Sequence, residues 1–182
     1  MTRTKAIVLL LVTFLFAGYQ SLSQTQTLID WNSQWSYFKG KTEPSNPNSS
    51  WRNTGFNASA WAKGSAPFRY GDGTTGTEIT DMINNYTTFY IRTEVTLDPD
   101  NLDQIKLTCD YDDGFVVWIN GQEVWKANIG TDYSYTAGAI NSHEFGEWTT
   151  LLLNKNDLNL VNGKNTIAVQ GFNVSRGSSD FY

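Results

Sequence analysis

Hydrophobic and polar residues alternate in short runs along the second half of the chain, and no long stretch has the spacing of an amphipathic helix. The runs are rich in β-branched and aromatic residues and are separated by Gly, Asn, Asp and Pro, which is typical of strands joined by turns. The clearest runs are Thr88–Leu97, Gln104–Cys109, Phe115–Asn120, Gln122–Ala127, Trp148–Leu153 and Asn165–Phe172. This pattern predicts an all-β sandwich or barrel.

The segments between these runs predict loops. Residues 40–60 are polar and indicate a long surface loop, with one helical turn at Asn57–Trp61. Pro99, in the segment DPDNLD, marks a break between two strands. Because the sequence contains no internal repeat and no interdomain linker, we expect a single domain over residues 24–182.

The dipeptide Asn120-Gly121 predicts a tight hairpin, since both residues tolerate the positive φ of a type I′ turn. The hairpin would pair Ile119 with Gln122, Trp118 with Glu123, Val117 with Val124 and Val116 with Trp125. Strand alternation then assigns Phe115, Val117, Ile119 and Val124 to a core face, and Val116, Trp118 and Trp125 to the other. The two tryptophans either form a platform for a sugar ring or lie under a neighbouring loop, and the rarity of exposed apolar patches of that size favours the loop.

The first 23 residues have the layout of a secretory signal peptide. Arg3 and Lys5 precede an apolar stretch over residues 6–17, and Ser21 and Ser23 provide a cleavage site before Gln24. The apolar stretch is too short to predict a membrane span. We therefore expect an exported protein, secreted or held at the cell surface.

The chain is acidic. Its formal net charge of -5 becomes -7 when residues 1–23 are removed, because Arg3 and Lys5 leave and no acidic residue does. Such a chain repels phosphate backbones and anionic lipids, which argues against nucleic acid and membrane partners. The single Cys109 cannot form an internal disulfide, and the absence of Cys/His clusters excludes structural zinc. We expect Cys109 to be a small buried hydrophobic residue.

A series of motifs resembles an accessory module found in exported multidomain proteins of Bacteroidetes-type bacteria. The motifs are WSY at 35–37, WR at 51–52, GFNASAWAKGSAPFRYGDG, TFYIRTEVTL, DDGFVVWINGQEV, NGKNTIAVQGFN and SSDFY. They occur in the same order as in the module, from about residue 28 to the end. The resemblance implies an antiparallel, galactose-binding-like jelly roll, similar also to the sugar-binding domain of some β-galactosidases. It further implies that the module stands beside catalytic, adhesive or sorting domains of a longer protein.

The end of the sequence departs from the module. SSDFY reads as the beginning of a strand, whereas modules of this type continue through a final strand. We therefore expect the domain to be truncated at its C-terminus.

The acidic segment DYDDG contributes Asp110, Asp112 and Asp113 directly before an apolar run. An EF-hand loop is excluded because its twelfth position would be Gly121 instead of Glu. The favoured interpretation is a β-turn, in which Asp side chains accept hydrogen bonds from nearby backbone N–H groups. The alternative is a calcium site built from several loops, to which Asp72 and Asp180 would also contribute. Adjacent aspartates before Gly also resemble the calcium and sugar loop of certain lectin-like adhesion domains.

Catalytic chemistry finds little support. Asp112 and Asp113 are neighbours whose side chains diverge in an extended segment, so they do not form the carboxylate pair of a glycosidase. His143 is the only histidine, and the sequence has no GxSxG motif. The glycines of YGDGTTG lack the strand-to-helix setting of a phosphate loop. We expect no enzymatic activity.

Aromatic residues in the loops are candidates for carbohydrate contact. Tyr133 and Tyr135 would stack on a sugar with Trp118 and Trp125, while Arg69 would bond its hydroxyls. Structural packing remains the favoured role of each. The resemblance implies that Trp31, Trp35, Trp51 and Trp61 are packing residues, and we expect Trp148, which opens a strand, to lie in the core.

The prediction is thus a non-catalytic, carbohydrate-binding-like module, with calcium as a structural ion. The alternative is an architectural module that packs against a catalytic or adhesive neighbour and binds no small ligand. A third hypothesis makes the chain the front of a hydrolase whose active site lies beyond Tyr182.

Overall fold

The computed structural model describes residues 25–182, so the expected signal peptide lies outside the described residues. The strands are β1 Gln34–Lys39, β2 Ala62–Ser65, β3 Phe68–Arg69, β4 Thr77–Glu78, β5 Thr88–Leu97, β6 Gln104–Cys109, β7 Gly114–Ile119, β8 Gln122–Ala127, β9 Thr149–Asn154 and β10 Gly163–Phe172. Three short 3₁₀ helices complete the elements: η1 Ser50–Arg52, η2 Pro99–Asn101 and η3 Lys155–Asp157. No helix within residues 25–182 has the length and hydropathy of a membrane span.

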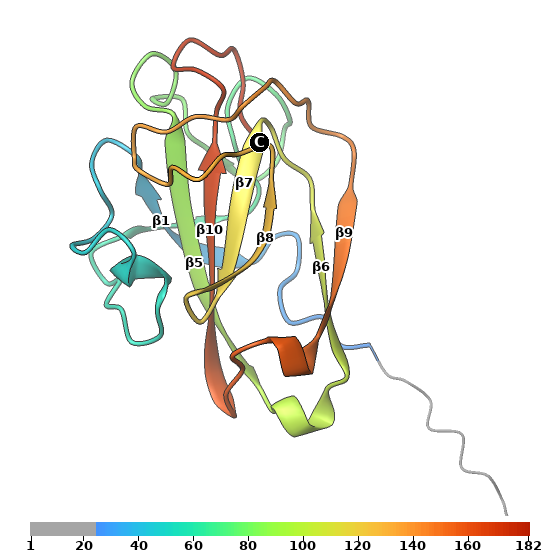
Figure 1. Ribbon diagram of the computed structural model, residues 1–182. Coiled ribbons are helices and arrows are strands. Elements are labelled where there is room, and N and C mark those ends of the chain that lie inside the picture. Colours follow the sequence, from blue (N-terminus) through green and yellow to red (C-terminus); the bar gives the residue numbers. More distant parts are fainter. Residues whose placement is uncertain (1–24) are drawn as a thin grey trace, which may run out of the picture.

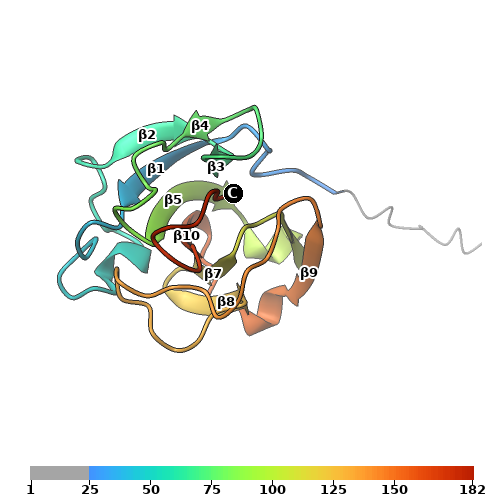
Figure 2. The same cartoon turned by 90° about the horizontal axis from the view of Figure 1, so that it is seen from above.

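The strands form two layers, which confirms the predicted all-β sandwich. One layer is a six-stranded antiparallel sheet in the order β2-β1-β5-β10-β7-β8 (Figure 1). The other consists of two separate pieces, the antiparallel pair β6-β9 and the short parallel pair β3-β4. Seen from above, the large sheet curves around the end of the chain, which lies between β3 and β9 (Figure 2).

The main core lies between these two layers. Phe89, Phe115 and Ile119 from the large sheet pack there with Phe68 from β3, and all four are buried. Leu107 of β6 also packs against this core but is only partly buried. The second layer therefore covers the large sheet incompletely.

A second core covers the opposite face of the large sheet. Trp51 is fully buried there and packs edge-on against Tyr90 and Trp118, with ring centroids 5.1 Å and 5.5 Å apart. The expected surface loop at residues 40–60 therefore covers a sheet face. Within the expected turn at Asn57–Trp61, the Trp61 N–H donates to the Ala58 carbonyl at 3.0 Å, and the short helix η1 at Trp51 was not predicted. Because both faces of β7 are buried, its sequence is a continuous apolar run.

The predicted hairpin is confirmed at its turn and corrected in its register. Asn120 and Gly121 have φ values of 50° and 82°, as a type I′ turn requires. A β-bulge after Val117 pairs this residue with Trp125, leaving Val124 as the extra residue of β8. Trp125 consequently packs against Phe115 at 4.9 Å on the main-core side, opposite to Trp118. The two tryptophans do not share a face.

The other predicted strands agree closely with the structure, whereas β1, β2, β3 and β4 were not predicted.

Cys109 is half-buried and packs against the main core, and burial raises the pKa of its thiol to about 12. Among the expected packing tryptophans, Trp35, Trp51 and Trp61 are buried. Trp31 and Trp148 are exposed, which corrects the prediction for both.

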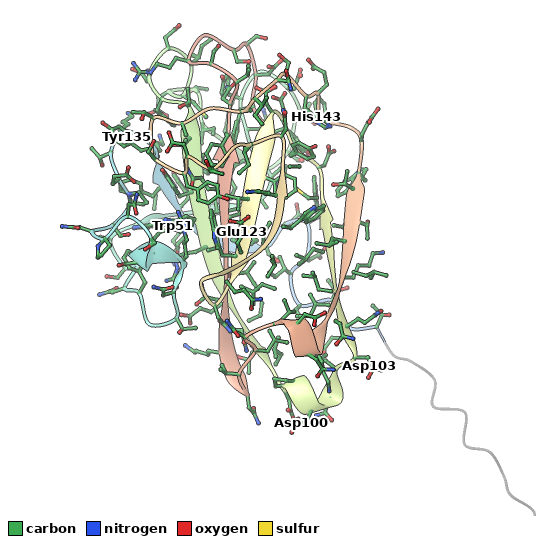
Figure 3. The ribbon with its side chains drawn as sticks, viewed as in Figure 1. Trp51, Asp100, Asp103, Glu123, Tyr135 and His143 are labelled. Atoms are coloured by element: carbon green, nitrogen blue, oxygen red, sulfur yellow. The ribbon has the colours of Figure 1, made fainter. Side chains whose placement is uncertain are left out.

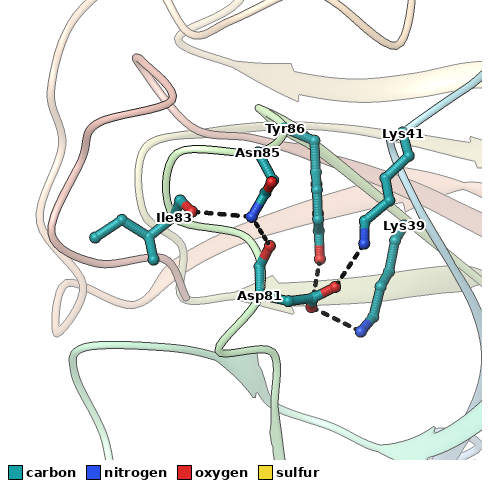
Figure 4. A network of polar contacts seen from close by, with 6 residues as sticks. All are labelled: Lys39, Lys41, Asp81, Ile83, Asn85 and Tyr86. Carbon is teal, nitrogen blue, oxygen red and sulfur yellow. Dashed lines mark hydrogen bonds and ion pairs between the residues drawn. The ribbon is translucent and has the colours of Figure 1, made fainter.

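A charged network ties the end of β1 to the loop before β5 (Figure 4). The Asp81 carboxylate accepts hydrogen bonds from Lys39 Nζ at 2.7 Å, from Lys41 Nζ at 2.8 Å and from the Tyr86 hydroxyl at 3.1 Å. Asn85 closes the loop by donating to the backbone carbonyl of Asp81. Burial opposes ionisation, but the hydrogen bonds from the two lysines outweigh it and lower the pKa of Asp81 to about 2.

We expect Asp81→Asn to lower the free energy of unfolding at pH 7 by less than about 1 kcal/mol, because more than a third of the carboxylate is exposed and water screens it. A lowered pKa contributes stability that is present above about pH 4 and is lost as the pH falls toward 2. Urea unfolding of both proteins should therefore give converging stabilities as the pH approaches 2. A difference that stayed constant over this range would contradict the prediction.

Candidate functional site

Four carboxylates from four separate segments meet at the end of the sandwich where the chain terminates. They belong to Asp72, Asp112, Glu144 and Asp180, and one oxygen from each lies within 4.8 Å of the others. We call this group the acidic corner. Asp72, Asp112 and Asp180 are three of the five predicted calcium ligands, and Glu144 was not predicted. The same end carries His143, whereas the acidic residues Asp100 and Asp103 lie at the opposite end (Figure 3).

Asp112 is the buried member of the acidic corner. Asp112 is 2% exposed, and its Oδ1 has no hydrogen-bond partner among residues 25–182. Burial, followed by the charges of Asp113, Asp180 and Glu144, raises the pKa of Asp112 to about 8. A buried carboxylate without a donor is costly, so this oxygen needs either a proton or a cation.

Asp113 has a different function from its neighbour. Its Oδ1 accepts a hydrogen bond from the backbone N–H of His143 at 2.8 Å, and its Oδ2 accepts one from the backbone N–H of Val174 at 2.7 Å. Its backbone carbonyl accepts from Asn128 Nδ2 at 2.9 Å. Both carboxylate oxygens thus hold distant loops in place, since their donors lie 30 and 61 residues away in the sequence. The favoured interpretation of DYDDG as a local β-turn is therefore corrected: the aspartate accepts hydrogen bonds from backbone N–H groups, but these groups belong to other loops.

Asp110 fixes the same loop at a second point, by accepting a hydrogen bond from the Gly146 N–H at 2.7 Å. The two bonds, at His143 and at Gly146, bracket Glu144 in the sequence. Asp110 and Asp113 therefore position the loop that brings Glu144 to Asp112. His143 completes the bracket by stacking on Tyr111 with ring centroids 4.1 Å apart.

The remaining two members of the acidic corner come from loops that approach each other closely. Arg69 donates from Nε to the Thr75 carbonyl at 2.8 Å and from Nη1 to the Asp72 carbonyl at 3.4 Å, which closes the loop carrying Asp72. Arg69 is thus a loop-closing residue in this structure. At Gly71, with φ of 79°, an added Cβ would lie 2.5 Å from the Ser179 carbonyl oxygen, so only glycine permits this approach.

The Asp180 segment is held from the interior of the protein. Buried Asn173 donates from Nδ2 to the Asp180 carbonyl at 3.0 Å and to the Tyr70 hydroxyl at 2.7 Å. The same Tyr70 hydroxyl donates to the Ser178 carbonyl at 3.0 Å, and burial raises the pKa of this phenol to about 12. The backbone around Asp180 is therefore fixed by buried groups, whereas its carboxylate remains directed to the acidic corner.

The acidic corner fits a calcium ion by donor type and spacing. Calcium prefers six to eight oxygen ligands at about 2.3–2.6 Å, so ligand oxygens on opposite sides of one ion are up to about 5 Å apart. The 4.8 Å limit among the four carboxylates falls inside this range. The buried Asp112 oxygen without a donor adds a reason for a cation at this position.

Four aromatic side chains lie beside the acidic corner. Phe145 follows Glu144 and stacks on Tyr182 at 4.8 Å, and Trp31 packs against Trp148 at 4.6 Å. Trp31 and Tyr182, 6.1 Å apart, join the two pairs. Trp148 is 56% exposed and Trp31 is 36% exposed. We call Trp31, Phe145, Trp148 and Tyr182 the aromatic patch, and it is accessible to a ligand.

The structure does not bring the predicted sugar-stacking residues together as an open platform. Trp118 is 2% exposed, since it is covered by Trp51, by the Tyr133 ring and by the Arg52 guanidinium, which lies 4.0 Å from its centroid. Trp125 lies on the opposite side of the sheet because of the β-bulge.

The two predicted tyrosines are also engaged within the protein. Tyr133 donates its hydroxyl to Glu123 Oε2 at 2.7 Å and accepts from Lys126 Nζ at 3.0 Å. The Tyr135 carbonyl accepts from the Thr88 hydroxyl at 2.8 Å, so its loop is fixed to β5. Both tyrosines pack against the second core. They complete the cover of the large sheet. Trp118 therefore lies under a neighbouring loop, which is the alternative that the sequence favoured over an open platform for a sugar ring.

Several solved structures resemble the chain in fold. Bacteroides uniformis β-glucuronidase 2, covalently bound to cyclophellitol-6-carboxylate aziridine, matches with a TM-score of 0.53 and 21% identity. A calcium binding mutant of the same enzyme matches with a TM-score of 0.52 and 20% identity. Both alignments cover 84% of this chain and 15% of the enzyme chain.

This chain therefore spans about 15% of the length of these two enzyme chains, and at this identity the likeness shows the fold. No protein-family model matches the chain, and no curated protein matches it.

Sequence reasoning missed Glu144, Trp31 and Trp148. Glu144 lies 32 residues after Asp112, and it is brought close by hydrogen bonds that its loop donates to Asp110 and Asp113. Trp148 precedes β9 directly and shares the outward face of Thr150 and Leu152, although its place at the start of an apolar strand had predicted a core residue. The one available indication was the acidic and aromatic composition of the segment HEFGEW.

We expect the metal-free protein to lose stability as the pH rises from about 4 to about 8. A carboxyl group whose folded pKa is about 8 binds more protons in the folded than in the unfolded state over this range, which stabilises the fold only at the lower pH. Asp112→Asn, which cannot ionise, should reduce the loss by an amount on the order of 1–3 kcal/mol.

Urea unfolding at pH 5 and pH 8 in chelator-treated buffer measures the effect. The matched control is Asp100→Asn, because Asp100 is exposed at the opposite end of the sandwich. Equal pH dependence in the wild type and in Asp112→Asn would contradict the assigned role of Asp112.

Proposed function

We propose that the chain is a non-catalytic, carbohydrate-binding module of a longer exported protein, with calcium bound at its acidic corner. One observation carries the proposal: an accessible aromatic patch adjoins four clustered carboxylates, one of which is buried without a hydrogen-bond donor. The fold, shared with a segment of β-glucuronidases, supports the same conclusion.

In this proposal Asp72, Asp112, Glu144 and Asp180 hold the calcium ion through hard carboxylate oxygens. The ion supplies positive charge that neutralises Asp112 and fixes the loops against one another. The aromatic patch offers ring faces to the apolar face of a sugar, and Trp148 is its most exposed member. Asp110 and Asp113 act as positioning residues, since their oxygens hold the Glu144 loop.

A non-enzymatic role fits the polar groups of this region. The His143 ring lies against Tyr111, and its Nδ1 is 3.0 Å from the Tyr111 carbonyl oxygen. Burial raises the pKa of the Cys109 thiol to about 12, so at neutral pH this group is a thiol and a poor nucleophile. Neither residue is arranged as an activated nucleophile or as its base.

The second candidate is the architectural module. Its specific support is the incomplete cover of the main core beside β6, where Leu107 is only partly buried. Such a module would keep the structural calcium ion and bind no sugar. The two candidates therefore share the acidic corner and differ in the function of the aromatic patch.

We expect calcium to raise the melting temperature of the protein relative to chelator-treated protein. A ligand present at 100 times its Kd stabilises the folded state by about 2.7 kcal/mol, and each kcal/mol corresponds to about 2–4 °C for a domain of this size. Asp112→Asn should abolish the rise, whereas Asp100→Asn should keep it. A rise of the same size in Asp112→Asn would exclude the acidic corner as the calcium site.

We expect Trp148→Ala to weaken binding to carbohydrate by about tenfold, which corresponds to about 1.4 kcal/mol. A glycan array with the calcium-loaded protein identifies a ligand, and calorimetry then compares the variants. Leu152→Ala is the matched control, because Leu152 is a similarly exposed apolar residue in β9, four residues after Trp148. A calcium-loaded protein that binds no glycan on the array would favour the architectural module.

A further inference from the structure

A pocket of about 410 Å³ opens beside β1, β2 and β5, next to the second core. The loop of residues 56–59 forms one of its walls, and Phe56 and Ala58 of this loop pack in the second core. Most of the residues that line the pocket are polar, and none of them belongs to the acidic corner or to the aromatic patch. The pocket is therefore a separate feature of the molecule.

Three residues on neighbouring strands form a row along the pocket. Ser36 of β1 pairs with Lys63 of β2 on one side and with Arg92 of β5 on the other, and all three line the pocket. Residues paired across strands point to the same face of a sheet, so the hydroxyl stands between two cations. Lys63 Nζ donates to Ser36 Oγ at 2.6 Å, and the hydroxyl keeps its own proton for an acceptor.

Arg92 is the buried cation of this row, and it is 4% exposed. Its Nη1 donates to the Phe56 carbonyl at 2.8 Å, and its Nη2 donates to the Asn53 carbonyl at 3.2 Å and to the Thr166 hydroxyl at 3.3 Å. These acceptors are neutral, so they hold the loop on the sheet without neutralising the guanidinium. Its Nε has no hydrogen-bond partner among residues 25–182, and no ion pair joins Arg92 to a carboxylate of that range.

The acidic residue of the lining does not neutralise Arg92. This residue is Glu94, and its carboxylate pairs instead with Lys164 Nζ at 3.2 Å. Burial lowers the pKa of Arg92 by more than the charge of Glu94 raises it. A buried cation without a counterion costs free energy, and an anionic group between Lys63 and Arg92 would reduce that cost.

We propose that this pocket binds a small hydroxylated carboxylic acid, with the carboxylate held between Lys63 and Arg92. The carboxylate accepts hydrogen bonds from both cations and from the Ser36 hydroxyl. The pocket is much larger than a carboxylate, and its volume lies within the range of small-molecule sites, about 300–1,000 Å³. Asn57 and Ser59 of the lining offer an amide and a hydroxyl to the hydroxyl groups of the ligand. An acidic monosaccharide has this combination of charge, size and hydroxyl groups.

This inference goes beyond the proposed function, because it adds a second ligand site. The site uses residues of β1, β2, β5 and the loop 56–59, and it requires neither the calcium ion nor the aromatic patch. Either proposal can therefore fail without the other.

The test is an NMR titration of the isotope-labelled protein with galacturonate, and with galactose as its neutral counterpart. The two sugars differ only in that galactose has a hydroxymethyl group in place of the carboxylate. The backbone amide signals of Ser36, Lys63 and Arg92 report on the pocket. We expect galacturonate to shift them in a saturable manner, and galactose to bind about tenfold more weakly or not at all. Glucuronate and glucose repeat the comparison with another arrangement of hydroxyl groups.

Lys63→Gln tests the contribution of the exposed cation. Since Lys63 lies at the surface, the variant should fold and bind the acids about threefold to fivefold more weakly. Lys106→Gln is the matched control, because it removes the same charge from an exposed position of β6 in the other layer. This control and Trp148→Ala should both bind the acids like the wild type.

Four results would overturn the inference. Neither acid shifts the three amides, or the acids and the neutral sugars bind equally well. Inorganic phosphate binds as tightly as galacturonate, which would mean a site for any anion. Lys63→Gln and Lys106→Gln weaken binding equally, which would mean a general effect of charge. Shifts confined to the amides around Trp148 would assign the acids to the aromatic patch, and would thus support the proposed function while excluding this second site.

Discussion

Burial of β7 on both faces is the constraint on which the rest of the structure depends. One face of this strand packs in the main core through Phe115, and the other packs in the second core through Trp118. A two-layer sandwich covers only one face of each sheet, so loops must cover the other. The loop that carries Trp51 and the loop that carries Tyr133 perform this function. Aromatic side chains in these loops are thereby used for packing, which explains why the sugar-stacking prediction placed there lacks an open platform.

The start of β7 also organises the acidic corner. Asp112 and Asp113 are adjacent, but their carboxylates have opposite environments. Asp113 accepts two backbone hydrogen bonds, one at each carboxylate oxygen. Asp112 Oδ1 accepts none among residues 25–182 and faces other carboxylates, so burial and repulsion raise its pKa to about 8. Through its hydrogen bond to His143, Asp113 holds the loop that keeps the Glu144 carboxylate close to Asp112, where the two charges repel. A cation bound between these carboxylates would attract both of them.

Sequence reasoning was successful where local chemistry decides the structure. The Asn120-Gly121 turn and the strand β5 follow from residues that are adjacent in the chain. It failed where distant segments decide: the β-bulge after Val117 moved Trp125 to the other face, and no short-range pattern indicates it. Glu144 could not be identified for the same reason, because its place depends on hydrogen bonds that its loop donates to Asp110 and Asp113. The strands β2, β3 and β4 were missed because strands of two to four residues carry few alternating positions. β1, which lies between β2 and β5, was missed because its buried and exposed residues do not alternate.

The acidic corner connects segments that are far apart in the sequence. Asp72 follows β3 by three residues, Asp112 follows β6 by three residues, and Asp180 directly precedes Phe181. Glu144 joins these three through the loop that Asp110 and Asp113 hold. An ion shared by the four carboxylates would therefore fix four segments against one another. Such coupling is reciprocal, so the hydrogen bonds that fix the Asp180 backbone and the Glu144 loop would also bring the carboxylates to a fixed spacing and strengthen calcium binding.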